Sequence, residues 1–255
     1  MKKAIFYTLA FAAIQLLVPY LIQTFLGLLT GKESASLNAT QMIISLAASS
    51  FAVIALFLYL HWAEVSRSYV RSRPWDSLFW CAIAAFGVII PSSFLQEQMP
   101  ELPNIVEQEF DMILRDRWGY FAVGLLAPVC EELVFRGAIL RALLGSISRH
   151  WRAIAISALL FALIHANPAQ MPHAFLVGLL LGWLYYRTSS IVPGIVYHWV
   201  NNSVAYVVYN LYPIPQMKLI DLFGSQRTVV AAVLFSLLIL LPALYQLNLR
   251  LRKAQ

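Results

Sequence analysis

Residues 125–136 read LLAPVCEELVFR, and this stretch places two adjacent carboxylates, Glu131 and Glu132, inside an apolar run. A carboxylate at the depth of a lipid bilayer costs roughly 2.5–3.5 kcal/mol even on a lenient insertion scale. A purely structural protein has little reason to bear that cost at two neighbouring positions. The stretch therefore predicts a functional site within a membrane-embedded helix.

The composition of the whole chain agrees with a membrane location. Of 255 residues, 60% are hydrophobic and only 12% are charged, whereas soluble domains carry about 25% charged residues. We therefore predict an all-α, polytopic membrane protein that forms a single domain over residues 1–255. The net charge of +6 does not predict nucleic-acid binding, because the basic residues lie at the ends of apolar runs, beside membrane lipids.

Apolar runs predict about eight transmembrane helices, since a hydrocarbon core of ~30 Å needs about 20 apolar residues. The predicted spans are 4–30, 41–62, 77–96, 119–145, 150–166, 172–187, 190–212 and 228–247. The first run is far longer than the apolar core of a signal peptide, so we expect it to be a retained helix. The long connection contains a segment, 104–118, that fits an amphipathic helix on the outer interface and a solvated acidic loop equally well.

Charge predicts the orientation of these helices. If both termini are cytoplasmic, the loops 63–76, 146–149 and 188–189 share their side. Thirteen of the 18 Lys and Arg residues then lie at or near the cytoplasm, as the positive-inside rule requires.

Spacing separates the two glutamates. Glu132 and Arg136 lie four residues apart and can pair on one helix face, which removes most of the cost of burying either charge. Glu131 points about 100° away from Glu132 and has no such neighbour. Glu132 is therefore predicted to be structural and Glu131 to be the free carboxylate.

Two histidines and an asparagine also interrupt apolar runs. His165 and His198 lie inside predicted spans, and Asn202 follows His198 by one helical turn. His61, His150 and His173 lie at span boundaries, where interfacial anchoring is the simpler interpretation. A shared site requires tilted or dipping helices, because ideal spans would place His165 near the outer end and His198 nearer the cytoplasm.

These residue types suit hydrolysis by activated water. A carboxylate shielded from bulk solvent can take a proton from water, and a histidine can orient that water. A His and an Asn side by side can donate hydrogen bonds to an oxyanion. Glu131, His165 and His198 could alternatively hold a metal such as zinc with an open position for water. Cys130 and Ser203 lack the surroundings of nucleophiles and are read as packing residues.

The three patterns Glu131-Glu132-x-x-x-Arg136, Phe161-x-x-x-His165 and His198-x-x-x-Asn202, in this order, resemble the motifs of the CPBP family. This family comprises CAAX proteases and bacteriocin-processing enzymes and is also named Abi. The continuation to Gly137 is similar to its bacterial members. The motif-bearing core spans about 119–203.

The resemblance implies an intramembrane endopeptidase related to the Ras-converting CAAX prenyl protease. It implies that Glu131 and His165 activate water, that His198 and Asn202 form the oxyanion hole, and that Glu132 and Arg136 support the site. The cofactor stays open between zinc and a metal-free mechanism. A multi-pass protein of a bacterial cytoplasmic membrane is expected, acting on a peptide or lipidated peptide, with its oligomeric state undetermined.

Two other functions remain open. A proton-coupled transporter would also carry intramembrane Glu, His and Arg residues, although the sequence shows no internal repeat of the kind common in transporters. A non-proteolytic scaffold or immunity protein could keep the same motifs for structural reasons.

Overall fold

The computed structural model describes residues 1–30, 37–212 and 217–253, and these residues form an all-α protein without a β-strand. The fold class predicted from the sequence is thereby confirmed. The longer helices are α1 (Lys2–Thr30), α2 (Ala39–Tyr59), α4 (Trp75–Glu97), α8 (His150–Ile164), α9 (Met171–Thr188), α10 (Val192–Leu211) and α12 (Gln226–Arg250). Short helices α3 (Arg67–Arg71), α5 (Glu107–Arg115) and α11 (Leu219–Phe223) lie in the connections.

The predicted span 119–145 is a helix of changing pitch. It consists of the π-helical segment η1 (Tyr120–Leu126), the α-helix α6 (Ala127–Val134), the π-helical segment η2 (Phe135–Leu140) and the short helix α7 (Arg141–Leu144). Both glutamates lie in α6, between the two π-helical segments.

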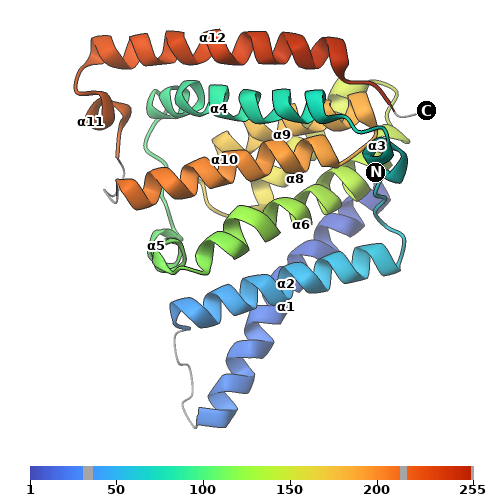
Figure 1. Cartoon of the computed structure of the whole chain (residues 1–255). Helices are drawn as coiled ribbons and strands as arrows, with labels where there is room; N and C mark the ends of the chain where they lie inside the picture. Colours follow the sequence, from blue (N-terminus) through green and yellow to red (C-terminus); the bar gives the residue numbers. More distant parts are fainter. Residues whose placement is uncertain (31–36, 213–216, 254–255) are drawn as a thin grey trace.

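The helices are stacked in a bundle in which most axes run in similar directions (Figure 1). Helix α12 packs along α4, and α10 covers the other side of α4. Next come α6 and then α2, while α8 and α9 form a pair behind α10. Helix α1 crosses α2 and continues beyond the bundle (Figure 1). The motif-bearing helices α6, α8 and α10 are thus central, and α1 and α12 lie at opposite margins.

Small residues allow the closest helix contacts. A Cβ atom at Gly87 of α4 would lie 2.8 Å from the backbone nitrogen of Leu240 on α12. On α9, a Cβ at Gly178 would lie 3.0 Å from Ala158 of α8, and one at Gly182 would lie 2.8 Å from Ile154. Spacing of small residues by four is a common device for bringing membrane helices together. Gly178 and Gly182 therefore set how closely α9 packs against α8.

The prediction of eight spans is not confirmed. Within the described residues, four helices are long and apolar enough to cross a membrane: α1, α2, α4 and α12. Helix α8 is apolar but shorter, at 15 residues. The central helices fall short because they carry the polar motif residues and because the change of pitch divides 119–145 into brief segments. The chain is a membrane protein whose most apolar helices surround a more polar centre.

The two termini lie at the same end of the bundle (Figure 1). The amino group of Met1 donates to the Ser146 hydroxyl at 3.5 Å, and Arg187 donates to the backbone carbonyl of Asn248 at 2.7 Å. Asp76 pairs with Arg250 at 3.3 Å at this end too. The loops that were predicted to share one side of the membrane with the termini therefore gather together.

The segment 104–118 contains a helix, α5, rather than only an acidic loop. Its apolar residues Ile113 and Leu114 are buried, and its polar face carries an ion pair between Asp111 and Arg115 at 2.7 Å. The hydroxyl of Tyr209 also donates to Asp111. This hydrogen bond, with the one from Arg115, holds the pKa of the Asp111 carboxyl below its usual value. Its location at a membrane interface remains a prediction.

Candidate active site

The π-helical segments on either side of α6 shape the site. A π-helical turn hydrogen-bonds residue i to i+5 and is found mostly as a local bulge, often at functional sites. The N–H of Ala127 accordingly bonds to the carbonyl of Ala122. The next carbonyl, that of Val123, accepts a hydrogen bond at 3.1 Å from Asn202 Nδ2 on α10. The change of pitch thus coincides with the point where a motif side chain joins η1 to α10.

Glu132 and Arg136 form a wholly buried ion pair. Arg136 Nη1 lies 2.7 Å from Glu132 Oε1, and both side chains have 0% exposure. Arg136 Nη2 also donates to the carbonyl of Gly178 on α9 at 3.2 Å. The guanidinium lies over the ring of Phe161 on α8, 4.5 Å from its centroid. One side chain of η2 therefore contacts α6, α8 and α9.

Gly194 provides the space for the Glu132 carboxylate. A Cβ at this position of α10 would clash with Glu132 Oε2. That oxygen has no hydrogen-bond partner among the described residues, whereas Oε1 accepts from Arg136 and contacts His198. Any larger residue at position 194 would push the carboxylate away from its partners.

His198 connects the two glutamates. Its Nδ1 lies 3.3 Å from Glu132 Oε1, and its Nε2 lies 3.8 Å from Glu131 Oε2. The second distance exceeds a hydrogen bond but allows one water molecule to contact both atoms. The Glu131 side chain is 21% exposed, against 0% for Glu132. Glu131 is thus the carboxylate of the pair that solvent or substrate can reach.

His165 follows the last residue of α8 and has a defined tautomer. Its Nδ1 lies 2.8 Å from the carbonyl of Phe161, and a carbonyl only accepts, so Nδ1 carries a proton. In the neutral ring, Nε2 then keeps its lone pair. The rings of His165 and His198 both approach Phe161 edge-on, with centroid distances of 4.9 and 5.9 Å. Phe161 therefore lies against both histidines.

Asn201 fixes the orientation of Asn202. Asn201 Nδ2 donates to Asn202 Oδ1 at 3.3 Å, while Asn202 Nδ2 donates to Val123. The two bonds assign the amide oxygen and nitrogen of Asn202 without ambiguity. An amide carries two N–H donors, and only one of those on Asn202 has an acceptor among the described residues. The other is available to a ligand.

Some of the residues predicted from the sequence are in direct contact in the structure, whereas others are linked only through a neighbouring side chain. Glu131, Glu132, Arg136 and His198 form one chain of contacts. His165 adjoins this chain through Phe161. Asn202 shares α10 with His198 and reaches across to η1. Glu131 and His198 therefore lie at a common depth in the bundle. Ideal helices without tilt would not bring them to the same depth.

The alternative metal set is not gathered as a binding site. In the part of the chain that the structure describes, no three His, Cys, Asp or Glu side chains lie close enough together to hold a metal ion. His198 Nδ1 lies 3.3 Å from Glu132 Oε1, and its Nε2 lies 3.8 Å from Glu131 Oε2. The predicted ligands Glu131, His165 and His198 are therefore not grouped as a metal site within the described residues, and no catalytic step is assigned to a metal.

Sequence reasoning missed several residues around the site. Gly178 and Gly194 matter through the space they leave, and Asn201 through its hydrogen bond. His173, read as an interfacial anchor, lies near both His165 and His198. The spacing of Gly178 and Gly182 is a sequence signal from which this close helix contact was predictable.

Comparison with known proteins identifies a family for the same segment. The UPF0177 protein YxdF of Lactococcus lactis subsp. lactis (strain IL1403) is 30% identical over 104 residues, which cover 40% of this chain. The chain spans about half, 52%, of that relative. No solved structure matches. The family predicted from the three motifs is confirmed for the segment that carries them: residues 114–204 match the type II CAAX prenyl endopeptidase Rce1-like family.

Proposed function

We propose that this protein is an intramembrane endopeptidase that hydrolyses a peptide bond in a lipidated or membrane-associated peptide. The observation that carries the proposal is the contrast between the two glutamates. Glu132 is buried and paired, whereas Glu131 is partly exposed and lies 3.8 Å from His198 Nε2, so one water molecule can contact both atoms. The match of residues 114–204 to an endopeptidase family supports this assignment.

In the proposed mechanism, Glu131 takes a proton from the attacking water, and the lone pair on His165 Nε2 accepts a hydrogen bond from it. The water oxygen bonds to the peptide carbonyl carbon, and the carbonyl oxygen becomes an oxyanion. Asn202 and, when its Nε2 carries a proton, His198 donate to that oxygen. Breaking of the C–N bond then returns the proton from Glu131 to the leaving amine. Glu132 and Arg136 hold His198 and α6 in place.

Loss of the oxyanion donor gives a testable effect. We expect Asn202→Ala to lower kcat for a cleaved peptide by about 10²–10³-fold, the cost typical of losing one such donor. Asn202 also donates to the Val123 carbonyl, so Asn202→Ala removes a link between α10 and η1 together with the oxyanion donor. Asn202→Asp keeps an acceptor for Asn201 but removes the N–H donors, so it should be equally inactive. An Asn202→Ala enzyme with unaltered kcat would contradict the role.

The substrate and the cofactor can be tested in one assay. Purified protein in detergent is given matched lipidated and unlipidated peptides, with and without chelator, and products are identified by mass spectrometry. The proposal predicts preferential cleavage of the lipidated peptide, because the polar site lies among apolar helices. Activity should survive chelation. Loss with chelator and recovery with zinc would replace the proposed mechanism by a metal-dependent one.

We further propose that the end of the bundle with both termini faces the cytoplasm of a bacterial cell. Labelling of single cysteines from each side of the membrane tests this orientation. A cysteine at Ser68 should react from the cytoplasmic side and one at Gln108, on α5, from the opposite side. Reversed labelling of the two positions would overturn the orientation without affecting the catalytic proposal.

A further inference from the structure

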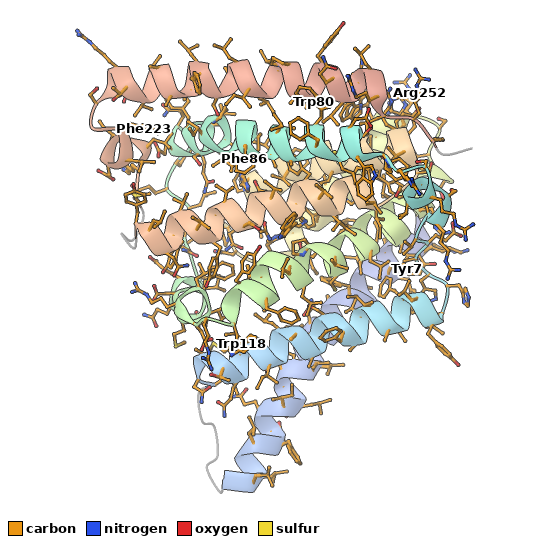
Figure 2. All side chains as sticks on the ribbon, in the orientation of Figure 1. Tyr7, Trp80, Phe86, Trp118, Phe223 and Arg252 are labelled. Atoms are coloured by element: carbon orange, nitrogen blue, oxygen red, sulfur yellow. The ribbon has the colours of Figure 1, made fainter. Side chains whose placement is uncertain are left out.

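A basic hollow lies at the end of the bundle that holds both termini, away from the catalytic residues. Its volume is about 800 Å³, and it is formed by residues 68–77 and by the C-terminal residues 250–253. Five cations and one carboxylate line it: Arg71, Arg73, Arg250, Arg252, Lys253 and Asp76. Figure 2 shows Arg252 where the chain leaves α12 at this end. The hollow thus has a strong excess of positive charge.

Only part of this charge is neutralised by the protein. Asp76 pairs with Arg250 at 3.3 Å and also accepts from the backbone N–H of Ser77 at 2.8 Å. Arg71, Arg73 and Arg252 have no side-chain ion pair or hydrogen bond within the described residues. Three guanidinium groups therefore converge on a cavity without an anion to balance them.

A buried hydroxyl in the wall also lacks a partner. Tyr69 is only 3% exposed, and among the described residues its hydroxyl makes no hydrogen bond, although Ser77 is near. Burial raises the pKa of Tyr69 to about 12, so the hydroxyl keeps its proton and can donate. The hydroxyl is itself shielded from the hollow, so the unpaired guanidiniums are the groups that an oxyanion would contact.

The position of the hollow relative to the membrane indicates where the anion comes from. Helix α4 begins at Trp75 and α12 ends at Arg250, and both are apolar enough to cross a bilayer. The hollow therefore lies at the level of lipid headgroups. Trp75, Phe79 and Val70 are exposed nearby, at 69%, 57% and 51%. Tryptophan at a helix end is typical of the membrane–water interface.

We propose that this hollow binds the phosphate group of an anionic phospholipid, whose acyl chains lie along the apolar surface of α4 and α12. Arginine forks suit phosphate oxygens because two N–H groups donate in parallel. Free phosphate shares the headgroup chemistry, but it makes no use of the exposed apolar side chains beside the hollow. The site is independent of the proteolytic proposal, since none of its residues belongs to the catalytic cluster.

Native mass spectrometry of the purified full-length protein tests the site. The protein is titrated with phosphatidylglycerol and, separately, with phosphatidylcholine, and retained lipid is counted. We expect selective retention of phosphatidylglycerol. Each basic residue near an anionic lipid typically strengthens binding by about fivefold. The triple variant Arg71→Gln, Arg73→Gln, Arg252→Gln should therefore bind phosphatidylglycerol about 100-fold more weakly. Arg250 is left intact because it pairs with Asp76.

The matched control removes three exposed cations from the same end but outside the hollow: Lys3→Gln, Arg149→Gln, Arg152→Gln. It should bind phosphatidylglycerol as the wild type does. Equal weakening in both triple variants would mean diffuse attraction and would overturn the proposal. Competition by glycerol phosphate as strong as by the lipid would assign the hollow to a soluble phosphate instead. If the triple variant does not fold, the three single variants apply the same test, with losses of about fivefold each.

Discussion

Glu131→Gln is expected to lower the turnover of a cleaved peptide by roughly 10²–10⁴-fold, the contribution typical of a general base, while the protein remains folded. Glutamine has nearly the same shape and keeps a polar group opposite His198, but it cannot take a proton from water. The side chain is 21% exposed, so its neutralisation leaves no buried charge without a partner. Steady-state kcat and the melting temperature in detergent measure the two halves of this expectation.

The control for Glu131→Gln is Glu64→Gln. Glu64 is 73% exposed and pairs with Arg141 at the end of the bundle, outside the catalytic cluster, so its neutralisation should leave kcat unchanged. Cleavage that persists at the wild-type rate in Glu131→Ala would remove Glu131 from the mechanism. An inactive but normally folded Glu131→Gln, beside an active Glu64→Gln, is the expected pattern.

Glu132→Ala is expected to cost about 3–5 kcal/mol of folding free energy, the range for breaking a buried ion pair by removing one partner. The substitution leaves the Arg136 guanidinium wholly buried, without its carboxylate, and also removes the contact of Glu132 with His198. Reversible denaturation in mixed micelles measures the loss. Where unfolding is irreversible, the melting temperature and folded yield rank the variants.

A double variant separates the ion pair from other contributions. Glu132→Leu with Arg136→Met removes both charges and replaces them by apolar side chains, so it should be more stable than Glu132→Ala alone. Glu131→Ala should lose little stability, because Glu131 is partly exposed. Equal destabilisation by Glu131→Ala and Glu132→Ala would contradict the division of roles between the two glutamates.

Hydropathy predicted where the long helices lie, because length and apolarity are local properties of the chain. The predicted run 41–62 corresponds to α2 (Ala39–Tyr59), and 228–247 corresponds to α12 (Gln226–Arg250). The π-helical pitch of η1 and η2 was not predictable, since hydropathy carries no signal for a local change of helical pitch. The number of membrane spans predicted from hydropathy is not confirmed, since four helices of the described residues are long and apolar enough to cross a membrane.

In the site, spacing within one helix was more informative than position across helices. The Glu132–Arg136 pair follows directly from a separation of four residues, and the structure contains it at 2.7 Å. The link between His198 and both glutamates joins residues more than 60 positions apart, as does the bond from Asn202 to Val123. The chemical roles of Glu131, His165, His198 and Asn202 stay predictions, since contacts alone do not measure turnover.

The contrast between the two glutamates also bears on how the protein enters the membrane. Glu132 and Arg136 lie one turn apart on the same helix, so they can neutralise each other as soon as that helix forms, before any neighbour arrives. Glu131 has no such local partner, and its contact, His198, is synthesised only 67 residues later. Until α10 inserts, the helix carries one unshielded carboxylate, at a cost of roughly 2.5–3.5 kcal/mol near the bilayer centre. We therefore expect α6 and α10 to enter the membrane together, because Glu131, the proposed general base, is unfavourably placed until His198 is beside it.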